Sequence, residues 1–170
     1  MPRLLPARFA AECIREFDRA ADERYVDAEA LAAVGRRTGA IYLHGYVVEM
    51  LLKAAYFRML RFTDTQVIAL SDLSAAVGTS AGSQARLLGL PGTRNYHNLG
   101  AWVELIITYR NRSGMPYAEL GFAGELADRV DTVHARWTEV IRYHKNTAYA
   151  HELRQVRDAS AWIMTHRTEL

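Results

Sequence analysis

The sequence predicts an all-α protein that folds as an antiparallel bundle of four or five main helices. Apolar residues recur at the 3.6-residue period of a helix along almost the whole chain, and no segment shows the alternation of a half-buried strand. Residues 39–60 are apolar on nearly every side, which is typical of a central helix covered by its neighbours. Half of the 170 residues are apolar, so we expect one core and a single domain over residues 1–170.

The main helices are placed by periodicity and by residues that favour helix ends. Pro6 suits the first turn of the first helix, Thr38 the N-cap of the central helix, and Asn98 the N-cap of the third. Gly114 and Pro116 are expected to end that third helix. The predicted main helices cover approximately residues 6–34, 39–60, 98–113, 122–141 and 150–166.

Residues 63–93 interrupt this pattern. Asp64 and Thr65 open a weakly periodic segment that continues to about Val77. Residues 78–92 are rich in glycine and serine, which is typical of turns and loops. We therefore expect an insertion around residues 63–93, with at most a short helix over residues 83–88.

The composition and the residue spacing bear on the cellular compartment and on whether the protein holds a metal or a cofactor. The single Cys13 cannot form an intrachain disulfide and favours a reducing compartment. The longest apolar stretch contains Glu49, Lys53 and Arg58, so we expect no membrane span, and we expect no secretory leader. The six histidines lack metal-site spacing, and no phosphate-binding loop precedes a helix. We therefore expect a cytoplasmic protein without a metal or a cofactor.

Two groups of polar residues are candidates for a binding site. Glu49 and Lys53 interrupt the apolar central helix, where a charge is costly unless it is paired or faces a cleft. Their four-residue spacing fits a local ion pair. It also fits a site in which one of them interacts with Arg142 across a groove. The second group is a basic segment that fits either a phosphate-binding groove or a solvated helix face, and it contains Arg142, Lys145, Arg154 and Arg157.

Three short motifs occur in order along the chain. They are Gly45-Tyr46-x-x-Glu49-x-x-Leu52-Lys53, then His97-Asn98-Leu99, then Trp137 followed by Arg142-Tyr143. Together they resemble the HEPN domain, the higher eukaryote and prokaryote nucleotide-binding family of helical proteins, over most of the chain outside residues 63–93. With the basic segment, the resemblance implies a ligand-binding site made of Arg142, Tyr143, Lys145, Arg154, Arg157, Glu49, Lys53 and His97.

The RNases of this family resemble one another in an Arg-x4–6-His motif near the start of the last helix. Arg142 stands at that junction, but His144 is too close to it and His151 is too far away. Arg129 and His134 have the required spacing, yet residues five apart on one helix point about 140° apart and do not converge. The motif is therefore missing where it is expected, and the remaining catalytic candidates are His144, His151, Arg129 and His134.

The resemblance implies three alternative functions. The first is a non-catalytic nucleotide- or RNA-binding module, cytoplasmic and homodimeric or partnered, in a toxin–antitoxin or defence system. The second is a metal-independent RNase of the toxin type, in which a histidine acts as general base and an arginine stabilises the developing phosphorane. The third is a structural partner of a nucleotidyltransferase-type protein. RNA cleavage in the presence of a chelator separates the second function from the other two.

Overall fold

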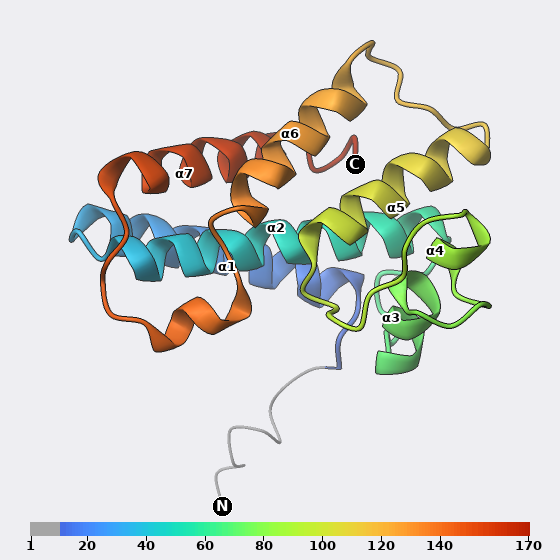
Figure 1. Cartoon of the computed structure of the whole chain (residues 1–170), viewed down its shortest axis with the longest axis horizontal. Helices are drawn as coiled ribbons and strands as arrows, with labels where there is room; N and C mark the ends of the chain where they lie inside the picture. The colour runs from blue at the N-terminus through green and yellow to red at the C-terminus, as the bar shows by residue number, and fades with distance from the viewer. Residues whose placement is uncertain (1–10) are drawn as a thin grey trace, which may run out of the picture.

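The computed structural model describes residues 11–170, so the helix start predicted at Pro6 lies outside the described residues. Within that range all regular structure is helical, and the helices form a bundle (Figure 1). The predicted all-α fold is therefore confirmed. The elements are α1 (Ile14–Ala33), α2 (Arg37–Met59), α3 (Leu70–Val77), α4 (Gln84–Leu87), α5 (Leu99–Arg112), α6 (Phe122–His134), the 3-10 helix η2 (Glu139–Tyr143) and α7 (Ala150–Thr165).

The helices α1 and α2 form the antiparallel pair on which the rest of the bundle is built. Gly35, at φ 73°, makes the turn between them in a backbone conformation that is strained for other residues. One stripe of α1 is buried, including Ile14 and Phe17, whereas α2 is buried on most of its sides, including Val47 and Leu51. The central position predicted for residues 39–60 is confirmed.

The remaining long helices cover α2. The helix α7 packs on α2 and α6, and α5 packs between α2 and α6. Figure 1 shows α7 running along the α1–α2 pair, while α5 and α6 cross that pair obliquely. The apolar stripe of α6 and the buried side of α5 meet α2 in one continuous core, whose members include Leu126, Val130, Trp102, Leu105 and Leu52.

Residues 63–93 contain two short helices that pack on each other. The helix α4 matches the short helix predicted over residues 83–88, whereas the segment predicted from Asp64 becomes helical only at Leu70. Ser83 is fully buried, and its hydroxyl donates to the Gly78 carbonyl at 2.6 Å and accepts the Arg86 N–H at 3.4 Å. One side chain therefore joins the end of α3 to the start of α4.

The helix predicted over residues 122–141 is wrong in its second half. The helix α6 ends at His134, and the chain turns before η2 begins at Glu139. The Trp137 side chain is 1% exposed, and its Nε1 donates to the Tyr42 carbonyl of α2 at 3.0 Å. A Cβ atom on Gly45 would lie 2.1 Å from the Trp137 ring, so the indole fills the space that Gly45 leaves on α2. This tertiary contact takes Trp137 out of the helical register that its sequence spacing suggests.

The prediction that Thr38 caps α2 is also wrong. The helix begins at Arg37, with Arg36 at the N-cap, and Thr38 lies in the first turn. Its hydroxyl instead accepts the backbone N–H groups of Thr147 and Ala148 at 2.9 and 3.0 Å. Thr38 therefore binds the segment before α7, a contact between residues more than 100 positions apart.

Candidate functional site

A buried ionic cluster lies between α2 and the start of α5. Glu49 is 3% exposed and Lys53 is 6% exposed, and Lys53 Nζ donates to the Glu49 carboxylate. His97 places Nδ1 at 3.0 and 2.9 Å from the two oxygens of that carboxylate. The structure therefore brings together the polar residues of the first two motifs. Because Glu49 and Lys53 are buried, a ligand on the surface would meet His97 and not its two partners.

His97 is held at the edge of this cluster by its own segment. The Asn98 side chain accepts the Ala101 N–H at 3.0 Å, which caps α5 as predicted. The hydrogen bond with Glu49 raises the pKa of His97, against the opposing effect of burial. The His97 side chain is 40% exposed, and none of the hydrogen bonds found over residues 11–170 uses its Nε2 atom. The exposed end of the cluster is therefore a histidine that is protonated more readily than an ordinary one.

Two tyrosines of α2 connect His97 with Arg142. The Tyr46 ring lies 6.1 Å from the His97 ring and 4.9 Å from the Tyr42 ring, between ring centres. The neighbouring Tyr42 and Tyr143 side chains raise the pKa of Arg142, whose side chain is exposed. Arg142 and His97 therefore lie at the two ends of the Tyr42–Tyr46 pair.

The segment between α6 and α7 carries two exposed tyrosine rings. One lies beside an arginine and the other beside a histidine of α7. Tyr143 is 73% exposed and Tyr149 is 67% exposed. The Arg142 guanidinium lies 4.7 Å from the centre of the Tyr143 ring. The His151 ring is stacked on the Tyr149 ring, 5.7 Å away and inclined by 13°. We call Arg142, Tyr143, Lys145, Tyr149 and His151 the loop surface.

The basic segment does not form a single groove. Lys145 and Arg154 are exposed, but Arg157 makes two hydrogen bonds to the Glu29 carboxylate of α1, one of them 2.8 Å long. The same carboxylate lies 3.6 Å from His44 Nε2. His44 and Tyr42 are two residues apart and therefore point about 200° apart on α2. Arg157 thus lies on the far side of α2 from Arg142, and Glu29 balances its charge.

A second polar network, which the sequence did not reveal, is buried under α7. His44 and Ser160 are fully buried, and Ser160 Oγ lies 2.8 Å from His44 Nδ1. His44 Nε2 has no hydrogen-bond partner among residues 11–170, and burial lowers the pKa of His44 to about 4. The Tyr25 ring of α1 packs edge-on against the imidazole. His44 is therefore a neutral core histidine with only one of its ring nitrogens hydrogen-bonded.

The four catalytic candidates are dispersed. Arg129 pairs with Glu125 at 2.9 Å and lies 5.8 Å from the centre of the Trp162 ring, whereas the His134 ring lies near Gly100 of α5. Arg129 and His134 therefore face different helices, as their spacing predicts. His144 and His151 are exposed, on either side of the loop that precedes α7.

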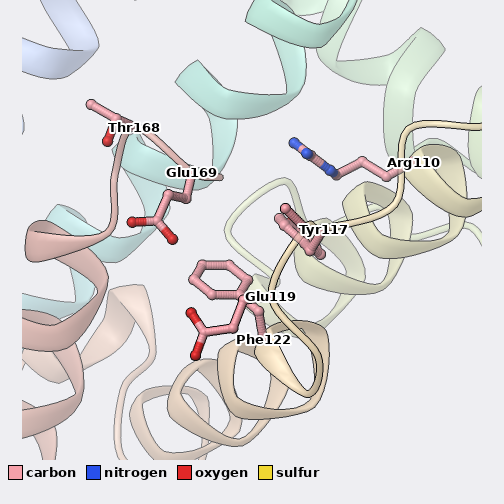
Figure 2. A pocket seen from close by; sticks show the side chains of 7 residues that line it. Arg110, Tyr117, Glu119, Phe122, Thr168 and Glu169 are labelled. Carbon is pink, nitrogen blue, oxygen red and sulfur yellow. The ribbon is translucent and has the colours of Figure 1, made fainter.

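A cavity of about 270 Å³ lies beside the loop between α5 and α6 (Figure 2). Arg110, one of its lining residues, donates to a main-chain oxygen of Leu170 at 2.6 Å and to the Met115 carbonyl at 3.1 Å. The guanidinium also lies 4.1 Å from the centre of the Tyr117 ring. The Arg110 contacts therefore tie the last residue of the chain to the α5–α6 loop, away from the motif residues.

Residues 11–170 contain no group of three or more His, Cys, Asp or Glu side chains placed to hold a metal ion. No helix in that range combines the length and the apolarity needed to cross a bilayer. Compared with known proteins, the chain matches no family model, no curated protein and no solved structure. The fold and the site define an α-helical bundle with an aromatic and cationic loop surface next to a buried ionic cluster.

Proposed function

We propose that the protein is a non-catalytic nucleotide- or RNA-binding module of the HEPN type, and that the loop surface binds the ligand. The observation that carries this proposal is the repeated pairing of an exposed tyrosine with a side chain suited to phosphate, Arg142 with Tyr143 and His151 with Tyr149. Aromatic rings stack on nucleobases, and a guanidinium donates two parallel hydrogen bonds to a phosphate. Because the bases of a duplex are already stacked, this chemistry favours a single-stranded ligand.

The loop surface rests on a fixed support. Trp137 and Thr38 anchor the two sides of the segment to α2, through the Tyr42 carbonyl and through the N–H groups of Thr147 and Ala148. A preorganised surface loses less conformational entropy when it binds. From the first turn of α7 the proposal uses only the His151 side chain. The backbone N–H groups of the helix end are not part of it, because Glu152 already accepts the Tyr149 N–H at 2.8 Å and balances the partial charge there.

The test is the fluorescence anisotropy of a short labelled single-stranded RNA at low salt, in the presence of a chelator. Tyr143→Ala should weaken binding about tenfold, the usual contribution of one stacked base. Arg142→Ala should weaken it as well and should make log K less steep against log salt, by about 0.7 for one lost phosphate contact. Arg19→Ala, which removes an exposed arginine of α1, is the matched control and should bind like the wild type.

The outcomes separate the alternative functions. Binding that is absent at low salt, or that is equal in all three variants, would remove the loop surface and favour the structural-partner alternative. RNA cleavage in the chelator, lost in folded His144→Ala or His151→Ala protein, would replace the binding module with a metal-independent RNase. Retained binding without cleavage supports the proposal.

A further inference from the structure

The exposed end of the buried ionic cluster adjoins the loop surface. His97 contacts Tyr46, Tyr46 contacts Tyr42, and Tyr42 lies beside Arg142. An RNA strand whose base stacks on Tyr143 and whose phosphate meets Arg142 would reach His97 along the half-buried Tyr42–Tyr46 pair. The His97 side chain is 40% exposed and can therefore be reached by the strand.

The hydrogen-bonding state of His97 decides what it presents to such a strand. Nδ1 lies against both oxygens of Glu49, so Nδ1 carries a proton in the neutral imidazole and Nε2 is a lone-pair acceptor. A lone pair repels a phosphate oxygen. When the imidazole gains its second proton, that proton is on Nε2, and the outer edge of the ring becomes a charged donor.

Four groups face His97 from the neighbouring elements. Glu49, Lys53 and Tyr46 belong to α2, and Glu139 belongs to η2. The Glu49 and Glu139 carboxylates favour the protonated ring, Glu49 most strongly, while Lys53 and burial oppose it. Glu49 is therefore a positioning residue, because it fixes the orientation of the ring and promotes its charge without reaching the surface.

We infer that His97 is a second phosphate contact for the strand bound at the loop surface, and that this contact forms only when the imidazole is protonated. The inference rests on the proposed function, since it concerns the same ligand. RNA binding is then linked to proton uptake. If the His97 ring is neutral in the free protein, it takes up one proton when the strand binds. Arg142 and Tyr143 supply the part of the affinity that does not depend on this proton.

The test compares wild-type protein with His97→Gln on the same labelled RNA, from about pH 6 to about pH 8.5, a range that spans the ordinary pKa of histidine. Glutamine can still donate to Glu49 but cannot become charged. The ratio of the variant Kd to the wild-type Kd should be about ten at the acidic end, the usual size of a charged hydrogen bond, and close to one at the alkaline end. Taking this ratio at each pH cancels the contributions of His144 and His151.

Two further proteins make the outcome specific. His97→Arg keeps a permanent charge beside Glu49, so it should bind RNA at the alkaline end as tightly as the wild type does at the acidic end. Tyr143→Ala should weaken binding at every pH and keep the pH dependence. In wild-type protein, adding the RNA should raise the pKa of the His97 imidazole in an NMR titration, which a purely structural histidine would not show.

The two proposals fail in different ways. If the wild type binds RNA and Tyr143→Ala weakens that binding, but the His97→Gln ratio stays near one at all pH values, the inference about His97 is wrong and the binding module stands. If no RNA binds at any pH, the binding module is wrong and the inference falls with it.

Discussion

Asn146, in the segment before α7, satisfies the first turn of α2: its Oδ1 accepts the Thr38 N–H at 3.0 Å. The same amide donates through Nδ2 to the Gly35 carbonyl at 2.9 Å. The Thr38 hydroxyl in turn accepts the backbone N–H groups of Thr147 and Ala148. Four hydrogen bonds thus tie the segment before α7, which carries the loop surface, to the turn between α1 and α2.

Replacing Asn146 by alanine should destabilise the protein and should also weaken the proposed RNA binding. The variant loses two hydrogen bonds and leaves the Thr38 N–H without its partner, so the free energy of unfolding should fall by about 2 kcal/mol. Urea denaturation measures the change. Asn111→Ala, at the exposed end of α5, is the matched control and should leave the free energy of unfolding within about 0.5 kcal/mol of the wild type. Equal free energies of unfolding for the two variants would show that the two Asn146 hydrogen bonds contribute nothing to stability.

Gly45→Ala should destabilise the protein although alanine is the better helix former. The new Cβ would lie 2.1 Å from the Trp137 ring, which is buried and hydrogen-bonded and cannot move without losing its contact to Tyr42. We expect a loss of about 2 kcal/mol from overpacking. Gly124→Ala on α6 has no atom within 4 Å of the new Cβ and should instead stabilise by about 0.5 kcal/mol. Thermal unfolding of the two variants should move in opposite directions.

His44 should make the protein less stable in mild acid. Its pKa is lowered from 6.5 to about 4 in the folded protein, so the unfolded chain binds a proton in a range where the folded one does not. Stability from this group is full above about pH 6.5 and falls as the pH drops towards 4, by up to about 3 kcal/mol. His97 acts in the opposite direction, since its pKa is raised.

The difference between wild type and His44→Gln isolates the contribution of His44. Urea denaturation at about pH 7 and about pH 4.5 should show a smaller acid-induced loss in His44→Gln than in the wild type. His144→Gln, which changes an exposed histidine, should lose as much as the wild type. An unchanged loss in His44→Gln would mean that the buried imidazole is not the acid-sensitive group.

Lys53→Met should be costly because it leaves a buried carboxylate with a single partner. Glu49 is 3% exposed and then relies on His97 alone. We expect a loss of about 3 kcal/mol, and we expect the Glu49→Gln/Lys53→Met double variant to lose less than the sum of the single variants, because the two charges are coupled. Strict additivity in a double-mutant cycle would contradict the ion pair.

The sequence predicted the central helix and the candidate ion pair for a local reason. In α2 the apolar residues surround the helix axis, so burial follows from their number and needs no knowledge of the neighbours. The spacing of Glu49 and Lys53 places them on one helix surface, and their contact is local as well. The N-cap of α5 is also a local interaction, because the Asn98 side chain accepts the N–H of Ala101, three residues further on, as predicted.

The candidate site was predicted only in part, because its geometry depends on long-range contacts. The basic segment fitted a groove shared by Arg142 and Arg157 as well as a solvated helix face, but Arg157 pairs with Glu29 of α1, on the other side of α2. The tyrosines that connect Arg142 to His97 were not recognised as part of the site, although the four-residue spacing of Tyr42 and Tyr46 was a usable signal. Ser160 gave no signal, since a serine on an α-helix acquires its role only from the histidine packed against it.

By itself the sequence determined the helical class, the identity of the buried helix and the residue types of the candidate site, because all three follow from periodicity and local spacing. The tertiary structure alone decided where α6 stops, what Thr38 binds and which cations share a surface. These features arise from contacts such as Trp137 on Gly45 and Asn146 on Thr38, whose partners are 92 and 108 positions apart in the chain. Such contacts override local preferences because they bury an indole or satisfy backbone groups that no nearby residue can reach.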